Sequence, residues 1–212
     1  AGEQDVGLLD FHIVQGLVLQ CYGILAQAHV VVVHGYGKHL LGMILADDVL
    51  VERGAHFLRG GQGAFTAARC LGAAAALSAG AYALAFPTFG PERRGAPMRA
   101  FTKIDTAPIG DRSAVHRAAF VIYLDETLVE DGWEDELAPG GLMLLNTKRA
   151  LDDPRILGID ADGISAAALG RPIPNTVFLG VIPALAAAVT IEDIHAGICA
   201  TMPEKLHAKN LR

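Results

Sequence analysis

Apolar segments separated by turn signals recur along the chain after residue 54. Five of these segments have the length and the β-branched or aromatic content of strands, and they cover residues 81–87, 97–104, 118–125, 140–147 and 155–160. A shorter apolar segment at residues 55–58 leads into an alanine-rich helix at about 64–78. Because strands alternate with helices and several strands are apolar on both faces, the pattern predicts an α/β fold with a mostly parallel sheet flanked by helices.

Two polar residues mark the expected starts of the last helices. Asn175 precedes the apolar run "TVFLG", and we expect its side chain to cap that helix. Thr190 precedes "IEDIHAGICA", where Glu192 and Asp193 favour the first turn of a helix electrostatically. The turn signals "APGG" (138–141) and "DDP" (152–154) are expected to separate strands from their neighbours.

Residues 1–54 differ in composition from the rest of the chain. All ten prolines lie at or after Pro87, and the first 52 residues contain Lys38 as their one basic residue and four of the eight histidines. Their periodicity is helix-like but interrupted by glycines, and the valine run at 30–33 fits a buried strand equally well. We therefore predict an N-terminal extension (1–54) followed by an α/β domain (55–212).

Charge and cysteine content exclude several classes of function. The net charge of −6 argues against a nucleic-acid partner, which needs a concentrated basic face. The three cysteines are far apart and form no CxxC pair, and histidines spaced every five residues at His29, His34 and His39 do not share a helical face. We expect no metal site in this chain.

Polar residues interrupt the apolar stretch at 6–33 too often for a membrane span, so we expect a soluble, cytoplasmic protein.

The glycine-rich sequence Gly60-Gly61-Gln62-Gly63 lies between the short strand and the alanine-rich helix. In an open parallel sheet, ligands bind at the carboxyl ends of strands, where the start of a helix offers unpaired amide groups to a phosphate. The sequence is neither GxGxxG nor a P-loop, and a tight turn that binds nothing is an equal alternative.

A second candidate is the segment "AFPTFGPERRGAPMRAF" (85–101), which joins two expected strands. It places Arg93 and Arg94 beside Glu92 and between two Gly–Pro turns. Paired guanidinium groups are suited to phosphates or carboxylates, and Glu92 can hold one of them in position. We favour a recognition surface, for a ligand or a neighbouring subunit, over a solvated charged loop.

Asp125 and Asn146 each follow an apolar strand, at positions that suit ligand binding, helix capping or turn closure equally. We find no nucleophile elbow, no paired catalytic carboxylates in a defined context and no activated cysteine. The chain is therefore expected to carry no catalytic residues of its own.

Together, "RGGQGAFTAAR", "AFPTFGPERRGAPMRAF", the "LD" at 124–125, "GGLMLLNT", "NTVFLG" and "EKLHAKN" resemble the gamma subunit of the 2-oxoacid:ferredoxin oxidoreductases. The resemblance runs from about residue 56 to the C-terminus. It implies a Rossmann-like domain in a complex with alpha, beta and ferredoxin-like delta subunits. Such complexes oxidatively decarboxylate a 2-oxo acid to acyl-CoA and CO2 and pass the electrons to ferredoxin or another acceptor.

The resemblance also implies how the ligands are shared among the subunits. Thiamine diphosphate, Mg²⁺ and [4Fe-4S] clusters belong to the partners, and the gamma domain closes over the active site and helps bind coenzyme A. Coenzyme A binding is carried over to Gly60, Gly61, Gln62 and Gly63, and also to Arg93 and Arg94, which can instead contact the alpha subunit.

The resemblance leaves several substrates open: pyruvate, branched-chain 2-oxo acids, aryl 2-oxo acids such as indolepyruvate or phenylglyoxylate, and 2-oxoglutarate. Residues 1–54 have no counterpart in the family, and the simplest explanation is that they form an added docking segment.

Two other interpretations of the chain remain beside the enzyme subunit. One is a stand-alone nucleotide-binding module, and the other is a purely structural subunit with an empty ligand site.

Overall fold

The computed structural model describes residues 41–47, 62–77, 81–88 and 98–211. These residues all lie within one compact unit, Gly37–Arg212. The predicted strand at 55–58, the valine run at 30–33 and the three evenly spaced histidines lie outside the described residues.

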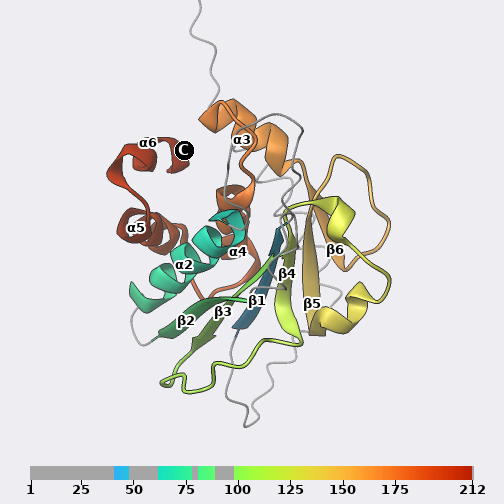
Figure 1. Ribbon diagram of the computed structural model, residues 1–212, viewed down its shortest axis with the longest axis horizontal. Coiled ribbons are helices and arrows are strands. Elements are labelled where there is room, and N and C mark those ends of the chain that lie inside the picture. The colour runs from blue at the N-terminus through green and yellow to red at the C-terminus, as the bar shows by residue number, and fades with distance from the viewer. Residues whose placement is uncertain (1–40, 48–61, 78–80, 89–97, 212) are drawn as a thin grey trace, which may run out of the picture. The chain divides into compact units, whose positions relative to one another are not determined.

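A six-stranded mixed sheet forms the centre of this unit (Figure 1), with the strand order β2-β3-β1-β4-β5-β6. The strands are β1 (Leu41–Asp47), β2 (Tyr82–Thr88), β3 (Met98–Asp105), β4 (Ala118–Tyr123), β5 (Leu137–Asn146) and β6 (Ile156–Ile159). Strands β1, β4, β5 and β6 pair in parallel, whereas β3 is antiparallel to both β1 and β2. The prediction of a mostly parallel sheet flanked by helices is therefore confirmed.

Helices α2, α4 and α5 lie together on one side of the sheet in Figure 1. The helices longer than one turn are α2 (Gln62–Leu77), α3 (Ala161–Leu169), α4 (Asn175–Leu185) and α5 (Ile191–Thr201), and the short ones are α6 (His207–Asn210), η1 (Glu126–Leu128), η2 (Trp133–Glu136) and η3 (Glu204–Leu206). Helix α2 contacts the sheet closely enough for Thr102 Oγ1 of β3 to donate a hydrogen bond to the carbonyl of Ala68, at 3.0 Å.

Small residues allow α2 and α5 to approach each other. Ala67, Ala74 and Ala75 of α2 are fully buried. A Cβ built on Gly197 of α5 would lie 2.7 Å from the backbone nitrogen of Ala74, which is closer than real Cβ contacts come. The alanine-rich composition of α2 therefore provides a flat surface for a second helix as well as high helix propensity.

The other side of the sheet has its own apolar core. Its buried members are Phe101, Ala118, Val121, Tyr123, Leu137, Met143 and Leu145. Partly buried side chains that follow β4, among them Leu128, Val129 and Trp133, pack against this cluster. The segment with the short helices η1 and η2 therefore covers part of the face opposite α2.

The strands predicted at 81–87, 97–104, 118–125, 140–147 and 155–160 are confirmed as β2 to β6, with shifted ends. Strand β1 differs from the prediction, because the sequence pattern of its region was interpreted as helix-like and the structure contains a strand there. It pairs with β3 on one side and β4 on the other, so long-range hydrogen bonds decide its conformation. It also lies before the proposed boundary at residues 54 and 55, which stays a prediction.

Two local predictions are wrong. The "APGG" signal is not a turn between elements, because it lies inside β5, where the register with β4 shifts and Gly140 has φ of +76°. Such an irregularity uses the same residues as a turn. Asn175 does not cap α4: it is the first helical residue, and Pro174 occupies the cap position. The prediction for Thr190 is confirmed, since its side chain accepts from the backbone of Asp193 in a reciprocal capping box.

Candidate functional site

The carboxyl ends of the parallel strands meet at one edge of the sheet. Strand β1 ends at Asp47, which is the register partner of Met98, the first residue of β3. The glycine-rich sequence belongs to the segment that follows Asp47, and Arg93 and Arg94 belong to the segment that precedes Met98. Gly60, Gly61, Arg93 and Arg94 themselves lie outside the described residues. The ends of both segments are nevertheless attached at paired positions of neighbouring strands.

The start of α2 contacts the start of α4. Gln62 and Gly63, the described half of the glycine-rich sequence, are the first two residues of α2. The side-chain nitrogen of Asn175 donates to the carbonyl oxygen of Gly63 at 3.1 Å. Neither α2 nor α4 has an acidic residue in its first turn, whereas α3 and α5 do. The positive ends of two helix dipoles are therefore left without a carboxylate of their own.

A further hydrogen bond connects α4 to the end of the chain. Thr176 Oγ1 donates to the side-chain oxygen of Asn210 in α6, at 3.0 Å. Two consecutive residues of "NTVFLG" therefore contact two other motifs: Asn175 bonds to "GGQG", and Thr176 bonds to "EKLHAKN". Three of the sequences that carry the family resemblance, more than 100 residues apart at the extremes, thus converge in the fold.

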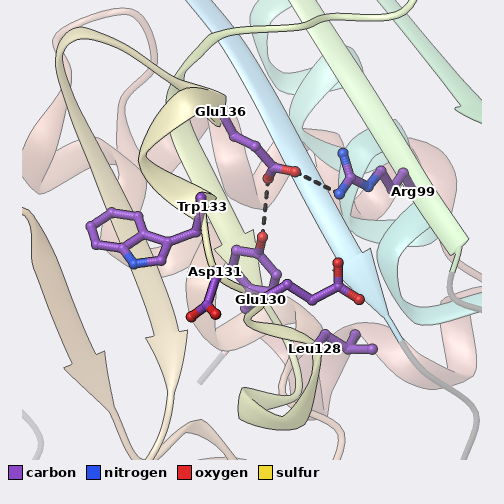
Figure 2. Close-up of a pocket in the computed structure, with 8 residues that line it drawn as sticks. Arg99, Leu128, Glu130, Asp131, Trp133 and Glu136 are labelled. Carbon is purple, nitrogen blue, oxygen red and sulfur yellow. Dashed lines mark hydrogen bonds and ion pairs between the residues drawn. The ribbon is translucent and has the colours of Figure 1, made fainter.

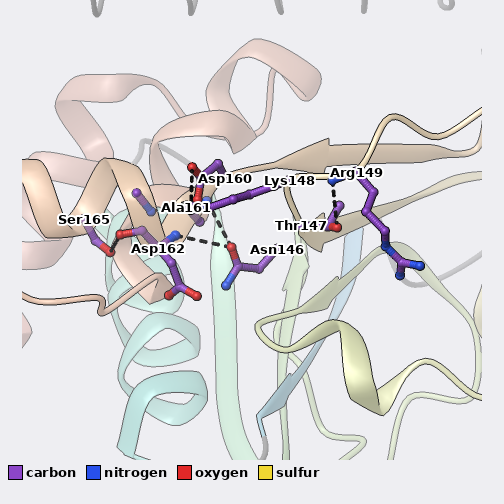
Figure 3. A network of polar contacts seen from close by, with 9 residues as sticks. Asn146, Thr147, Lys148, Arg149, Asp160, Ala161, Asp162 and Ser165 are labelled. Atoms are coloured by element: carbon purple, nitrogen blue, oxygen red, sulfur yellow. Dashed lines mark hydrogen bonds and ion pairs between the residues drawn. The ribbon is translucent and has the colours of Figure 1, made fainter.

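Asn146 lies at the same edge, at the end of β5, and links two elements (Figure 3). Its side-chain nitrogen donates to the carbonyl of Leu124 at 2.9 Å, and its oxygen accepts from the backbone nitrogens of Ala161 at 3.0 Å and Asp162 at 3.3 Å. Asp160 caps the same helix by accepting from Gly163 N at 2.8 Å. Asn146 therefore holds the start of α3 against the end of β4.

Asp125 also has a local role. Its carboxylate accepts from the backbone nitrogen and the hydroxyl of Thr127, both at 2.8 Å, and it caps η1. Of the alternatives that the sequence left open for Asp125 and Asn146, the structure contains the capping interactions.

A pocket opens beside the end of β4 on the face opposite α2 (Figure 2). Arg99, Tyr123, Leu128, Glu130, Asp131, Gly132, Trp133 and Glu136 line it. Glu136 accepts from the hydroxyl of Tyr123 at 3.0 Å and forms an ion pair with Arg99. Burial, together with the negative charge of Glu136, raises the pKa of Tyr123 to about 12.

Sequence reasoning missed this pocket. Its residues come from β3, β4 and the segment that contains η1 and η2, and no short motif joins them. The dense acidic sequence "EDGWEDE" (130–136) was the available signal, but such a run usually indicates a solvated surface.

The two described cysteines, Cys70 and Cys199, do not belong to any group of metal ligands among the described residues. The thiol of Cys70 is buried 2.9 Å from Thr201 Oγ1, burial raises its pKa, and Cys199 is exposed. Within the described ranges, no group of three or more His, Cys, Asp or Glu residues is arranged to hold a metal ion. Of the described helices, none has both the length and the apolar character needed to cross a membrane.

The strand order and the contact between the starts of α2 and α4 define an α/β domain of the Rossmann-like class, in which ligands generally bind at the carboxyl edge of the sheet. A family model described as "Pyruvate ferredoxin/flavodoxin oxidoreductase" matches residues 59–212. The chain belongs to this family, which confirms the resemblance inferred from the sequence.

The relatives include named subunits of pyruvate synthase and of pyruvate/ketoisovalerate oxidoreductases. The chain is 46% identical over 156 residues to the pyruvate synthase subunit PorC of Methanothermobacter marburgensis, covering 72% of this chain and 87% of that protein. It is 40% identical over 168 residues to the pyruvate/ketoisovalerate oxidoreductases common subunit gamma of Pyrococcus furiosus, covering 73% and 88%.

Solved structures have the same fold. The crystal structure of the pyruvate oxidoreductase subunit PORC from Thermotoga maritima matches with a TM-score of 0.65 at 31% identity, covering 82% of this chain and 92% of that one. A 2-oxoglutarate:ferredoxin oxidoreductase from Magnetococcus marinus, solved with 2-oxoglutarate, coenzyme A and succinyl-CoA bound, matches with a TM-score of 0.61 at 17% identity. This match covers 83% of our chain and 30% of the longer chain, and at that identity it shows the fold alone.

Proposed function

We propose that this chain is the gamma subunit of a multisubunit, cytoplasmic 2-oxoacid oxidoreductase, and that it helps bind coenzyme A and close the active site. The complex oxidatively decarboxylates a 2-oxo acid of the pyruvate type, or an aryl 2-oxo acid, to acyl-CoA and CO2 and reduces ferredoxin or another acceptor. The names of the archaeal relatives support the assignment as a subunit and favour pyruvate as the substrate.

The observation that carries the proposal is the hydrogen bond between Asn175 and Gly63. It brings together the starts of two helices that lack acidic first turns, at the end of the glycine-rich sequence. Backbone amides at helix starts bind phosphate groups, and coenzyme A carries both a pyrophosphate and a 3′-phosphate. We assign the pyrophosphate to the amides around Gly60, Gly61, Gln62 and Gly63.

Arg93 and Arg94 are assigned to the same ligand. Their segment ends at Met98, which pairs with the last residue of β1, so it is attached at the edge from which the glycine-rich segment departs. Guanidinium groups there add charge-assisted, bidentate contacts to phosphate oxygens.

The remaining cofactors are assigned to partner subunits. Thiamine diphosphate with Mg²⁺ supplies the carbanion chemistry of decarboxylation when bound, and [4Fe-4S] clusters carry the electrons. In this chain, the described residues offer no group of metal ligands, and the described cysteines are a buried, hydrogen-bonded thiol and a single exposed one. This arrangement does not fit a cluster ligand set, which requires several cysteines close together. We therefore assign the clusters to the alpha, beta and delta subunits.

The test is a coenzyme A titration of the reconstituted complex. The chain is expressed with and without its partners, the complex is isolated by size, and the wild type is compared with the double variant Gly61→Val, Arg94→Ala. We expect weaker coenzyme A binding with an unchanged rate of 2-oxo acid decarboxylation. Arg117→Ala is the control, because this exposed arginine precedes β4 and so lies at the amino edge of the sheet.

Two other outcomes correspond to the alternative functions. If the complex assembles and the double variant binds coenzyme A as the wild type does, the chain is a structural subunit. If the chain alone is a stable monomer or homodimer that binds an adenine nucleotide and does not join the partners, it is a stand-alone nucleotide-binding module.

A further inference from the structure

Asn175 is buried in an unusual way. Its exposed fraction is 5%, and its nitrogen is bonded to Gly63 of α2, yet its side-chain oxygen is buried without a hydrogen-bond partner among the described residues. The orientation of the amide follows from chemistry, because the reversed orientation would direct its oxygen at the Gly63 carbonyl, placing two acceptors face to face.

An unpartnered buried acceptor lowers stability, so the side-chain oxygen of Asn175 makes no favourable contribution to folding. Asn175 does not cap α4 either, since it is the first helical residue. The one described interaction of its side chain is the bond to Gly63, which crosses between two helices. This bond restrains the carbonyl of the second residue of α2, and therefore the peptide planes of the first helical turn.

We propose that Asn175 is a positioning residue for coenzyme A: by holding the Gly63 carbonyl, it fixes the direction of the free amides at the start of α2. The inference rests on the proposed function, in which those amides bind the pyrophosphate. Asn175 acts through Gly63 and does not itself contact the reacting groups.

Asn146 provides a matched control. It is an asparagine of similar burial (8% exposed) whose nitrogen also donates to a backbone carbonyl, and it also joins the start of a helix to a second element. Its partners are Leu124, directly after β4, and the first residues of α3, and none belongs to α2. The same substitution at the two positions therefore separates a general loss of packing from a specific effect on α2.

The experiment uses the reconstituted complex with Asn175→Asp, Asn175→Ser and Asn146→Asp. Asn175→Asp places a carboxylate oxygen against the Gly63 carbonyl, and Asn175→Ser removes the donor from reach without any change in charge. We expect both to raise the KM for coenzyme A by about tenfold with little change in kcat, because small displacements of a positioning group can cost up to about 10²-fold. Hydrogen exchange of the amides at 66–68, which in α2 bond to the carbonyls of residues 62–64, is expected to accelerate in both. Asn146→Asp should leave the KM and this exchange unchanged.

The proposal is overturned if Asn175→Asp and Asn175→Ser leave both the KM and the exchange at 66–68 unchanged, or if Asn146→Asp changes them equally. If the Gly61→Val, Arg94→Ala variant loses coenzyme A affinity while the Asn175 variants retain it, the positioning role is wrong and the proposed function stands. If the Asn175 variants only accelerate exchange and no variant affects coenzyme A, the proposed function fails, and with it the role of Asn175 in coenzyme A binding.

Discussion

Glu136 of η2 and Arg99 of β3 form an ion pair across the carboxyl end of β1 (Figure 2). Arg99 and Tyr123 are both register partners of Ala46, which lies between them on β1. The second oxygen of Glu136 accepts from the hydroxyl of Tyr123, so one carboxylate connects β3 to β4 over the strand between them. This connection lies where the glycine-rich segment departs from β1 and the arginine segment enters β3.

Glu136→Gln tests this connection, because glutamine keeps an acceptor for Tyr123 and removes the charge. We expect the pKa of Tyr123 to fall from about 12 towards its ordinary value near 10, since burial remains but the negative charge is lost. The free energy of unfolding should fall by about 1 kcal/mol, because Arg99 is half-exposed and its ion pair is solvent-screened.

The measurement is the alkaline titration of phenolate absorbance, with Tyr123→Phe identifying the contribution of Tyr123, together with urea unfolding. Glu134→Gln is the control, since Glu134 neighbours Arg155 and does not contact Tyr123. An unchanged Tyr123 titration in Glu136→Gln would show that burial alone raises this pKa.

The ion pair between Lys103 and Asp111 is expected to make the stability of the fold depend on pH. The buried ammonium of Lys103 donates to the Asp111 carboxylate at 2.8 Å, and this bond, with those from Ser113, holds the pKa of Asp111 well below its usual range. A carboxyl with a depressed folded pKa stabilises the fold above its unfolded pKa near 4, and this contribution is lost as the pH falls through the folded pKa.

Asp111→Asn should therefore lower the unfolding temperature at pH 7, and its difference from the wild type should shrink as the pH falls below about 4. Thermal unfolding from pH 7 down to acid conditions measures this difference. Asp131→Asn is the control, because Asp131 is exposed with no hydrogen bond or ion pair among the described residues. A difference that stays constant with pH would contradict the assignment.

Gly197→Ala tests the contact between α2 and α5. The added methyl group would meet the backbone of Ala74 at 2.7 Å, and backbone cannot move aside as a flexible side chain does. We expect a loss of about 1–3 kcal/mol in the free energy of unfolding, measured by denaturant titration.

Gly180→Ala in α4 is the matched control for that loss. A Cβ there meets nothing within 4 Å, so the higher helix propensity of alanine should raise stability by up to about 1 kcal/mol. Equal effects of the two substitutions would mean that the contact between α2 and α5 tolerates a side chain.

Most strands were predictable because local pattern and tertiary environment agree. Strands β2, β4 and β6 consist mostly of apolar or β-branched residues, and β3 mixes such residues with polar ones. Strand β1 was not predictable, because "LGMILAD" is also compatible with a helix and its conformation depends on pairing with β3 and β4. Pro139 and Gly140 indicated a turn but form an irregularity within β5, a distinction that depends on the neighbouring strand.

The sequence alone was sufficient to determine the fold class, the helix start capped by Thr190 and the family, because these depend on periodicity, local hydrogen bonds and motifs of contiguous residues. Only the tertiary structure decided that Asn175 reaches Gly63 instead of capping its own helix, and that Glu136 joins Arg99 to Tyr123. These contacts connect residues that are far apart in the sequence, and their geometry depends on how helices and strands pack. Sequence spacing does not encode that geometry, since many packings satisfy the same pattern of apolar positions.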